Sequence, residues 1–185
     1  MSHLQRFEGL DLDVELSDNC SYADLGQVQS IREENFEDGG QVIESSFEGY
    51  GRCFRADLED GGKLAFVICK EDMGPEIYIL VRAHEETHAI IHFLGDKAIS
   101  YLEEILEESG LPIKMGKEDE EVQASIMGVY ALLKGGVNTN FAFFTADHER
   151  QKYLARAIDI VKEQRPDLGL QSLMMWQMKY YFNKA

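Results

Sequence analysis

The chain has 185 residues, of which 44% are apolar and 28% charged, as expected for one globular domain spanning residues 1–185. Its 18 basic and 34 acidic side chains give a formal net charge of −16. This charge argues against binding to nucleic acid or to an anionic membrane surface, since both require a basic footprint.

The sequence also predicts a cytoplasmic protein. No stretch reaches the roughly 18 consecutive apolar residues that a membrane span needs. Residues 1–6 lack the apolar core and the small-residue cleavage site of a signal peptide. Three cysteines are too few, and of the wrong parity, for a disulfide framework, so we expect them to be reduced core residues.

The N-terminal half predicts a small sheet. Residues 1–40 are acidic and weakly patterned, and a helix is predicted over residues 22–36, ending before a Gly-Gly pair. Residues 50–58 and 64–69 are strand-like and flank a second Gly-Gly turn, which predicts an antiparallel hairpin. Residues 64–69 form either a central core strand or an edge to which an extended substrate adds as a strand.

The second half predicts helices. Pro75 suits the first turn of a helix, and Gly95 suits its end. Between them, apolar residues and histidines recur at spacings of three and four, with one step of one: Ile77, Leu80, Val81, His84, His88 and Ile91. Further helices are predicted over residues 97–108, 118–134, 146–163 and 168–182. Sheet before helices predicts an α+β fold: a small antiparallel sheet packed on a helical subdomain, with a metal-site core over residues 75–134 and C-terminal helices over residues 146–182.

The motif His84-Glu85-Glu86-Thr87-His88 lies within the first of these helices. Residues four apart share one helix face, so both imidazoles can bind one metal ion. Glu85 can then accept a proton from a water at the open position of the metal, while zinc makes that water acidic. These residue types at this spacing predict a zinc metallopeptidase. The alternative is a structural histidine pair, which would be costly in the apolar surroundings that Ala89 and Ile90 provide.

A catalytic zinc ion needs a third protein ligand. His92 does not suit this role, because three successive turns of a straight helix do not converge on one ion; we expect it to pack or to make a hydrogen bond outside the ligand set. Ile91 and Leu94 exclude the metzincin pattern. The remaining candidates are glutamates on later predicted helices: Glu103, Glu104, Glu107, Glu108, Glu118, Glu120 and Glu121.

Glu121 is the preferred third ligand. It opens an apolar helix whose small residues (Ala124, Ser125 and Gly128) allow close approach to the metal helix. The alternative role for Glu121 is an acidic residue that stabilises the helix N-terminus through the dipole.

Together these motifs resemble those of the gluzincin metallopeptidases. The metal helix, with Ala89 and His92 following His88, is most similar to that of the soluble ImmA/IrrE-type proteins, which often reads H-E-x-x-H-A-x-x-H. Glu121-x-x-Ala124 resembles the start of the E-x-x-A-D motif of the HtpX-like membrane peptidases. The resemblance covers residues 75–134.

The resemblance implies zinc ligation by His84, His88 and Glu121, with Glu85 as the general base of peptide-bond hydrolysis. Ser125 stands where many relatives have Asp, and Glu86-Thr87 replaces the usual Leu-Gly, which places a charge near the site. These departures favour altered specificity or lost activity.

Other features give weaker predictions. His148 or Tyr153 is a candidate hydrogen-bond donor to the oxyanion, with a helix-capping or surface role as the alternative. The tail predicts either a helix that closes the core or a homodimer surface, because it is rich in Met and aromatic residues: Leu173, Met174, Met175, Trp176, Met178, Tyr180, Tyr181 and Phe182.

We therefore expect a zinc metallopeptidase that acts on a protein or peptide substrate. Two alternatives remain: an acidic adaptor or chaperone-like binding protein, and a zinc-binding pseudoenzyme. The acidic run Asp119, Glu120 and Glu121 predicts a negative rim that favours basic peptide segments.

Overall fold

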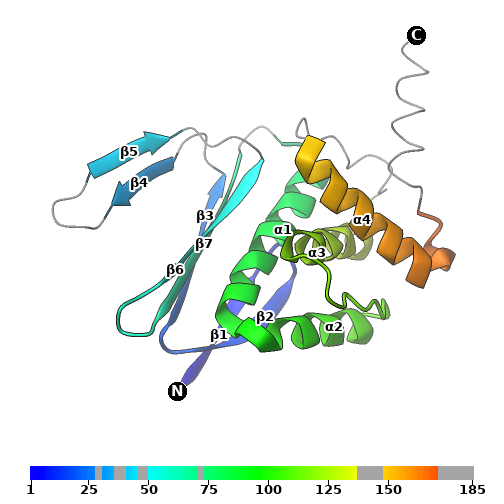
Figure 1. The fold of residues 1–185 in the computed structure, drawn as a ribbon, viewed down its shortest axis with the longest axis horizontal. Helices are drawn as coiled ribbons and strands as arrows, with labels where there is room; N and C mark the ends of the chain where they lie inside the picture. Colours follow the sequence, from blue (N-terminus) through cyan, green and yellow to red (C-terminus); the bar gives the residue numbers. More distant parts are fainter. Residues whose placement is uncertain (28–30, 36–40, 46–49, 71–72, 137–147, 171–185) are drawn as a thin grey trace, which may run out of the picture.

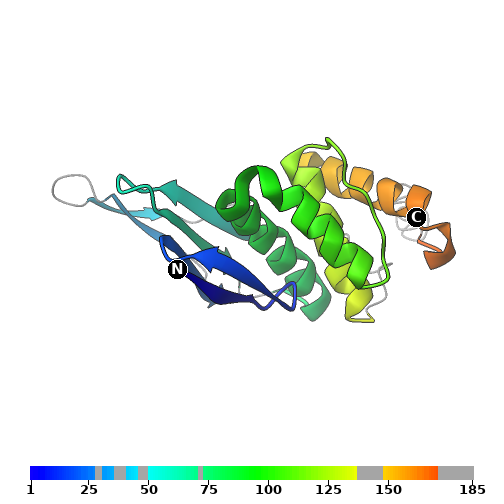
Figure 2. The ribbon, with the colours of Figure 1, turned by 90° about the horizontal axis from the view of Figure 1, so that it is seen from below.

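The computed structural model describes residues 1–27, 31–35, 41–45, 50–70, 73–136 and 148–170. Within these residues, seven strands precede four α-helices, which confirms the predicted α+β class. Figure 2 shows the strands, then α1, then α3 and finally α4 following one another across the molecule. Helix α1, which contains His84 and His88, therefore lies between the sheet and the remaining helices.

The central sheet has the order β3-β7-β6 and packs one face on α1 (Figure 1). The strands are β1 (Ser2–Phe7), β2 (Leu12–Ser17), β3 (Cys20–Gln27), β4 (Ile31–Asn35), β5 (Gln41–Ser45), β6 (Gly51–Asp57) and β7 (Lys63–Cys69). The predicted hairpin is confirmed, because β6 pairs antiparallel with β7 across a turn in which Gly61 has a φ of +80°. Strand β7 is also parallel to β3, so residues 64–69 are central.

Two further antiparallel pairs flank this sheet. Strands β1 and β2 form a hairpin that contributes Phe7, Val14 and Leu16 to the core. Strands β4 and β5 form a ribbon that extends beyond one end of the central sheet (Figure 1).

The helix predicted over residues 22–36 is wrong, because the structure has β3 and β4 there. Gly26 weakens a helix at this place, and Tyr22 packs its ring on Phe7, with the centroids 4.5 Å apart. The backbone of β3 instead bonds to β7, a partner far away in the sequence. Tertiary pairing of this kind is not visible in local sequence patterns.

The other predicted helices that fall on described residues are confirmed. They are α1 (Pro75–Leu94), α2 (Ala98–Glu108), α3 (Glu120–Lys134) and α4 (His148–Gln164), together with short 3-10 turns η1 (Gly95–Lys97) and η3 (Pro166–Leu168). Most of the helix predicted over 168–182, and with it the Met- and aromatic-rich tail, lies outside the described residues. No helix in the described part of the chain combines the length and the apolar character needed to cross a membrane.

Helices α1 and α3 approach each other closely along a line of small residues. A Cβ atom at Gly128 would come within 2.9 Å of the carbonyl oxygen of Leu80. Ala124 and Ser125, one turn earlier on α3, are buried. This close packing brings the N-terminal turn of α3 beside the middle of α1, where the two histidines lie.

Candidate metal centre

His84, His88 and Glu121 come together in a group that can hold a metal ion. The Nε2 atoms of His84 and His88 are 3.1 Å apart. The carboxylate of Glu121 has one oxygen 3.3 Å from Nε2 of His84 and the other 3.5 Å from Nε2 of His88. The two histidines come from α1 and the glutamate from the first turn of α3, as the sequence predicts.

The three side chains lie near the spacing of a metal-ligand set. Zinc binds imidazole nitrogen and carboxylate oxygen at about 2.0–2.1 Å, so two ligand atoms of a tetrahedral site lie about 3.3–3.4 Å apart. The two imidazole nitrogens are 3.1 Å apart, and each has a different oxygen of Glu121 at 3.3 or 3.5 Å. With one ligand atom taken from each residue, the three atoms lie within 4.8 Å of one another, which is close enough to surround one metal ion.

The remaining ring nitrogen of His88 binds Glu120. Its Nδ1 atom is 2.5 Å from Oε1 of Glu120, and the same oxygen accepts a bond of 2.5 Å from Nη1 of Arg55 on strand β6. An ionised carboxylate has no proton to give, so Nδ1 of His88 is the donor. This bond leaves Nε2 of His88 as the atom whose lone pair faces the proposed ion.

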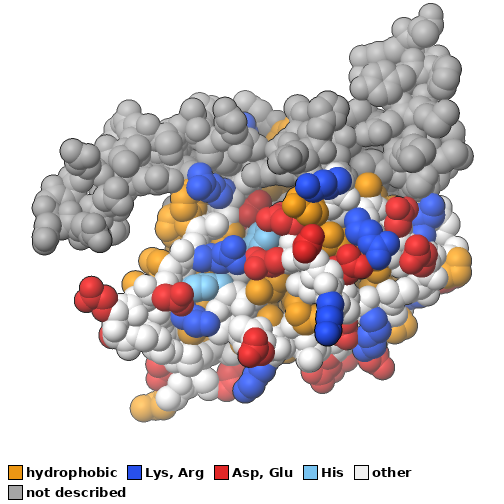
Figure 3. All heavy atoms as spheres, viewed as in Figure 1, with side chains coloured by type: hydrophobic (Ala, Val, Ile, Leu, Met, Phe, Trp, Pro, Cys, Tyr) orange, Lys and Arg blue, Asp and Glu red, His pale blue; other side chains and the backbone are white. Residues whose placement is uncertain are grey.

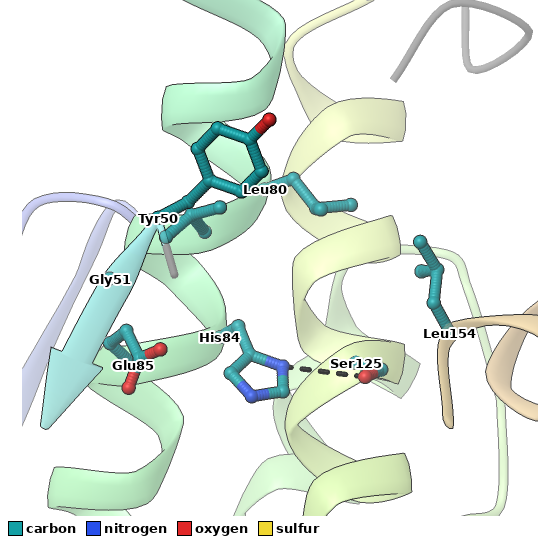
Figure 4. Close-up of a pocket in the computed structure, with 8 residues that line it drawn as sticks. Tyr50, Gly51, Leu80, His84, Glu85, Ser125 and Leu154 are labelled. Carbon is teal, nitrogen blue, oxygen red and sulfur yellow. Dashed lines mark hydrogen bonds between the residues drawn. The ribbon is translucent and has the colours of Figure 1, made fainter. Parts of the chain in front are cut away.

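Ser125 imposes the same tautomer on His84. The Ser125 hydroxyl donates its proton to the carbonyl oxygen of Glu121 at 2.7 Å. Its oxygen lies 3.3 Å from Nδ1 of His84 (Figure 4) and therefore accepts from that nitrogen. When both histidines are neutral, the Nε2 lone pairs of His84 and His88 and the carboxylate of Glu121 all face the same point. This arrangement is electrostatically costly unless a cation lies between them.

The charges around His88 also favour a cation. Burial lowers the pKa of His88, but the hydrogen bond to Glu120 and the nearby Glu85 and Glu121 outweigh burial and raise this pKa above its usual value. The bond to His88 in turn lowers the pKa of Glu120, with a smaller contribution from Arg55. Glu120 is therefore ionised at neutral pH, and a proton competes with any metal ion for His88.

Glu85 lies beside His84 on the side that faces strand β6 (Figure 4). Its side chain is buried and lines two adjoining pockets, which share Gly51, His84 and Glu85. A Cβ atom at Gly51 would lie 3.0 Å from Cγ of Glu85, so glycine at this position allows β6 to begin directly over the helix. Histidine side chains reach the surface on the face drawn in Figure 3, among acidic and basic side chains.

Glu86 points away from the site, contrary to our expectation of a charge beside it, and the buried Thr87 donates its hydroxyl proton to the carbonyl oxygen of Ala83 at 2.7 Å. The carboxylate of Glu86 is fully buried and accepts the backbone N–H groups of Gly9 and Leu10 at 3.0 Å each, and Nε of Arg82 at 3.1 Å. Burial raises the pKa of Glu86 above its usual value, against these bonds, which lower it. Glu86 therefore connects α1 to the turn between β1 and β2 through hydrogen bonds and is not part of the candidate metal centre.

The other sequence candidates lie elsewhere. Nε2 of His92 lies 3.2 Å from the carbonyl oxygen of Ala56, a packing role that agrees with its exclusion as a ligand. Of the candidate glutamates, Glu121 is the one that forms a possible metal-binding group with the histidines among the described residues, whereas Glu120 bonds to the other ring nitrogen of His88. Tyr153 is half-buried, and its neighbour Leu154 lines the site. His148 begins α4, and its side chain is outside the described residues.

The sequence does not predict the roles of two residues at the site. It indicates Glu120 as a candidate ligand and as part of an acidic rim, not as the partner of His88, and it gives no role to Arg55. The pair Glu120-Glu121 at the start of α3 was the available signal, since adjacent residues at a helix N-terminus can reach two sides of one site. Nothing in the sequence signals Arg55, because its role depends on its side chain reaching Glu120 in the first turn of α3.

No protein-family model, no curated protein and no solved structure matches this chain. The resemblance to gluzincins therefore has one structural support, the group formed by His84, His88 and Glu121 at the HExxH spacing.

Proposed function

We propose that the protein is a zinc-dependent peptidase. The observation that carries this proposal is the convergence of two imidazole nitrogens and a carboxylate oxygen within 4.8 Å of one another, in a pocket that the buried side chain of Glu85 also lines. Two His and one Glu is a ligand set that catalytic zinc ions use while keeping one position open.

His84, His88 and Glu121 would hold the zinc ion, and their donor set fits it. A bound zinc ion supplies a Lewis acid that polarises a carbonyl and makes water acidic enough to attack it near neutral pH. Glu85 accepts the proton of that water and delivers it to the leaving amine. Its burial beside Gly51 limits the contact of this carboxylate with bulk water.

Strand β6 gives the site a place for an extended peptide. It lies at the edge of the central sheet, since the order within the described residues is β3-β7-β6. Gly51, Cys53 and Arg55 of this strand line the polar pocket that contains the metal group. Peptides often bind by adding a strand to such an edge. The alternative that residues 64–69 receive the substrate is excluded, because β7 is paired on both sides.

The test compares hydrolysis and zinc content in two variants. Glu85→Gln keeps the shape of the side chain but removes its basicity, so we expect intact zinc binding and a loss of peptide hydrolysis of at least about a hundredfold. Glu104→Gln, on an exposed position of α2, is the matched control and should behave as the unsubstituted protein. Hydrolysis that survives in Glu85→Gln would refute the mechanism.

Two further outcomes identify the alternatives. Near-stoichiometric zinc without hydrolysis of any peptide in a diverse library would indicate a zinc-binding pseudoenzyme. Purified protein that neither contains zinc nor binds it would indicate the adaptor. Unchanged zinc affinity in Glu121→Ala would refute the third ligand.

A further inference from the structure

The two pockets that meet at the site have opposite chemistry. One is lined by Tyr50, Leu80, Val81 and Leu154 and is predominantly apolar. In Figure 4 it lies among β6, α1, α3 and α4, with His84 at its lower end. The other is predominantly polar, and beyond His84 and Glu85 it is lined by His88, Glu121 and a stretch of β6 that includes Arg55. A substrate group at the metal centre would therefore have an apolar neighbour on one side and a charged one on the other.

The polar pocket contains charges of both signs. The polar pocket includes two arginines, Arg52 and Arg55, and two carboxylates, Glu85 and Glu121. The guanidinium of Arg52 lies over Phe54, so Arg55 is the cation that faces these carboxylates. A bound divalent ion would bring the summed charge of Arg55, Glu85, Glu120 and Glu121 to zero, with Arg55 and the ion as the positive groups that attract a carboxylate and repel a cation.

Arg55 is the arginine that faces the site. Along a strand, side chains alternate between the two faces, and Arg55 shares its face with Gly51 and Cys53, which pack toward α1. Its bond to Glu120 uses one of five guanidinium N–H donors. The guanidinium of Arg52 lies over the ring of Phe54, 4.7 Å from its centroid, on the opposite face.

We propose that this site selects peptides that carry an apolar side chain on one side of the reacting carbonyl and a carboxylate on the other, with Arg55 binding the carboxylate. The apolar side chain occupies the pocket formed by Leu80, Val81 and Leu154. The proposal rests on the peptidase function and names its substrate class. An acidic side chain and a free C-terminal carboxylate offer Arg55 the same chemistry.

Arg55 is suited to this role because it is held in place before substrate binds. Glu120 fixes the guanidinium from one side, so less side-chain freedom is lost when a carboxylate binds from the other. A charge-assisted hydrogen bond to a partly exposed arginine should improve binding by about tenfold.

The test measures peptide binding by fluorescence anisotropy in zinc-saturated Glu85→Gln, which does not require turnover. The probes are short labelled peptides with adjacent leucine and glutamate, in both orders, and the same peptides with glutamine or lysine in place of glutamate. A further pair ends at the leucine as a free carboxylate or as an amide. We expect the best glutamate peptide or the free-carboxylate peptide to bind about tenfold tighter than its neutral counterpart, and the lysine peptides to bind weakest. These arms identify which carboxylate Arg55 recognises.

The variants assign this preference to residues. Arg55→Gln, added to Glu85→Gln, should reduce the preference for a carboxylate to less than about twofold. Arg52→Gln removes the same charge from the opposite face of β6 and should retain the preference. Leu154→Phe fills the apolar pocket and should weaken binding of the leucine peptides relative to alanine peptides. Zinc content is measured in each variant, and Arg55→Lys replaces Arg55→Gln if the latter loses zinc.

Equal binding of glutamate, glutamine and lysine peptides would overturn the proposal, and so would an equal effect of Arg55→Gln and Arg52→Gln. Because binding is measured in a variant without the general base, these results are independent of whether the protein hydrolyses peptides. Failure of the peptidase proposal would instead appear as absent zinc or absent turnover.

Discussion

Replacement of Glu120 tests whether the metal centre depends on the carboxylate behind His88. Glu120 accepts the Nδ1 proton of His88 at 2.5 Å, and the His88 side chain is 8% exposed. Glu120→Gln keeps an acceptor but removes its charge, whereas Glu120→Ala leaves the buried N–H without its partner. Partners of this kind change metal affinity by about 10–100-fold, which corresponds to about 1.4–2.7 kcal/mol. We expect Glu120→Gln at the lower end of this range and Glu120→Ala at the upper end.

Zinc affinity is measured by competition with a fluorescent chelator near neutral pH. Glu118→Gln is the matched control, because Glu118 precedes the same helix but pairs with Arg156 at 2.7 Å, away from the site. Its affinity for zinc should be unchanged. A change below about twofold in Glu120→Ala, or an equal change in Glu118→Gln, would refute the reasoning.

Three further predictions concern stability and pH. Glu86→Ala removes the fully buried partner of Arg82 and of two backbone N–H groups. Urea unfolding should show a free energy of unfolding that is lower by about 3–5 kcal/mol. A loss below about 1 kcal/mol would contradict a stabilising role for these buried hydrogen bonds. Gly128→Ala brings a Cβ atom to 2.9 Å from the Leu80 carbonyl and should cost about 1–3 kcal/mol, whereas Gly74→Ala, whose nearest neighbour would be 3.6 Å away, should be tolerated. Zinc affinity should fall with decreasing pH, because the pKa of His88 is raised and the protonated imidazole does not bind metal. The loss of affinity approaches about tenfold per pH unit below that pKa. A zinc affinity that stays constant from about pH 5 to 8 would exclude His88 as a ligand.

The sequence was most informative for helix α1, which contains both a regular apolar spacing and the two histidines. In α1, Pro75, Gly95 and the regular apolar spacing between them predicted the helix, and the structure confirms it. The same spacing placed His84 and His88 on one face. The hairpin of β6 and β7 was equally accessible, because its two strands and its turn are contiguous in the chain.

Local sequence patterns did not predict the elements whose hydrogen-bond partners lie far away in the sequence. Residues 22–36 carry no strong periodicity, and their strands depend on bonds to residues far away or on the hairpin formed by β4 and β5. Glu86 belongs by spacing to the HExxH motif, yet its function is fixed by the turn near Gly9, which the motif does not contain.

By itself the sequence determined the α+β class, the helix that carries the two histidines and the candidate ligands, since these follow from periodicity, caps and the spacing of His84, Glu85 and His88. Only the tertiary structure decided that Glu121 joins the histidines, that Glu120 and Ser125 orient them, and that Arg55 faces the site. The physical reason is that ligand spacing and hydrogen-bond direction between elements depend on how closely the elements pack. Here that packing is set by small residues such as Gly51 and Gly128, and their effect appears only when the chain is folded.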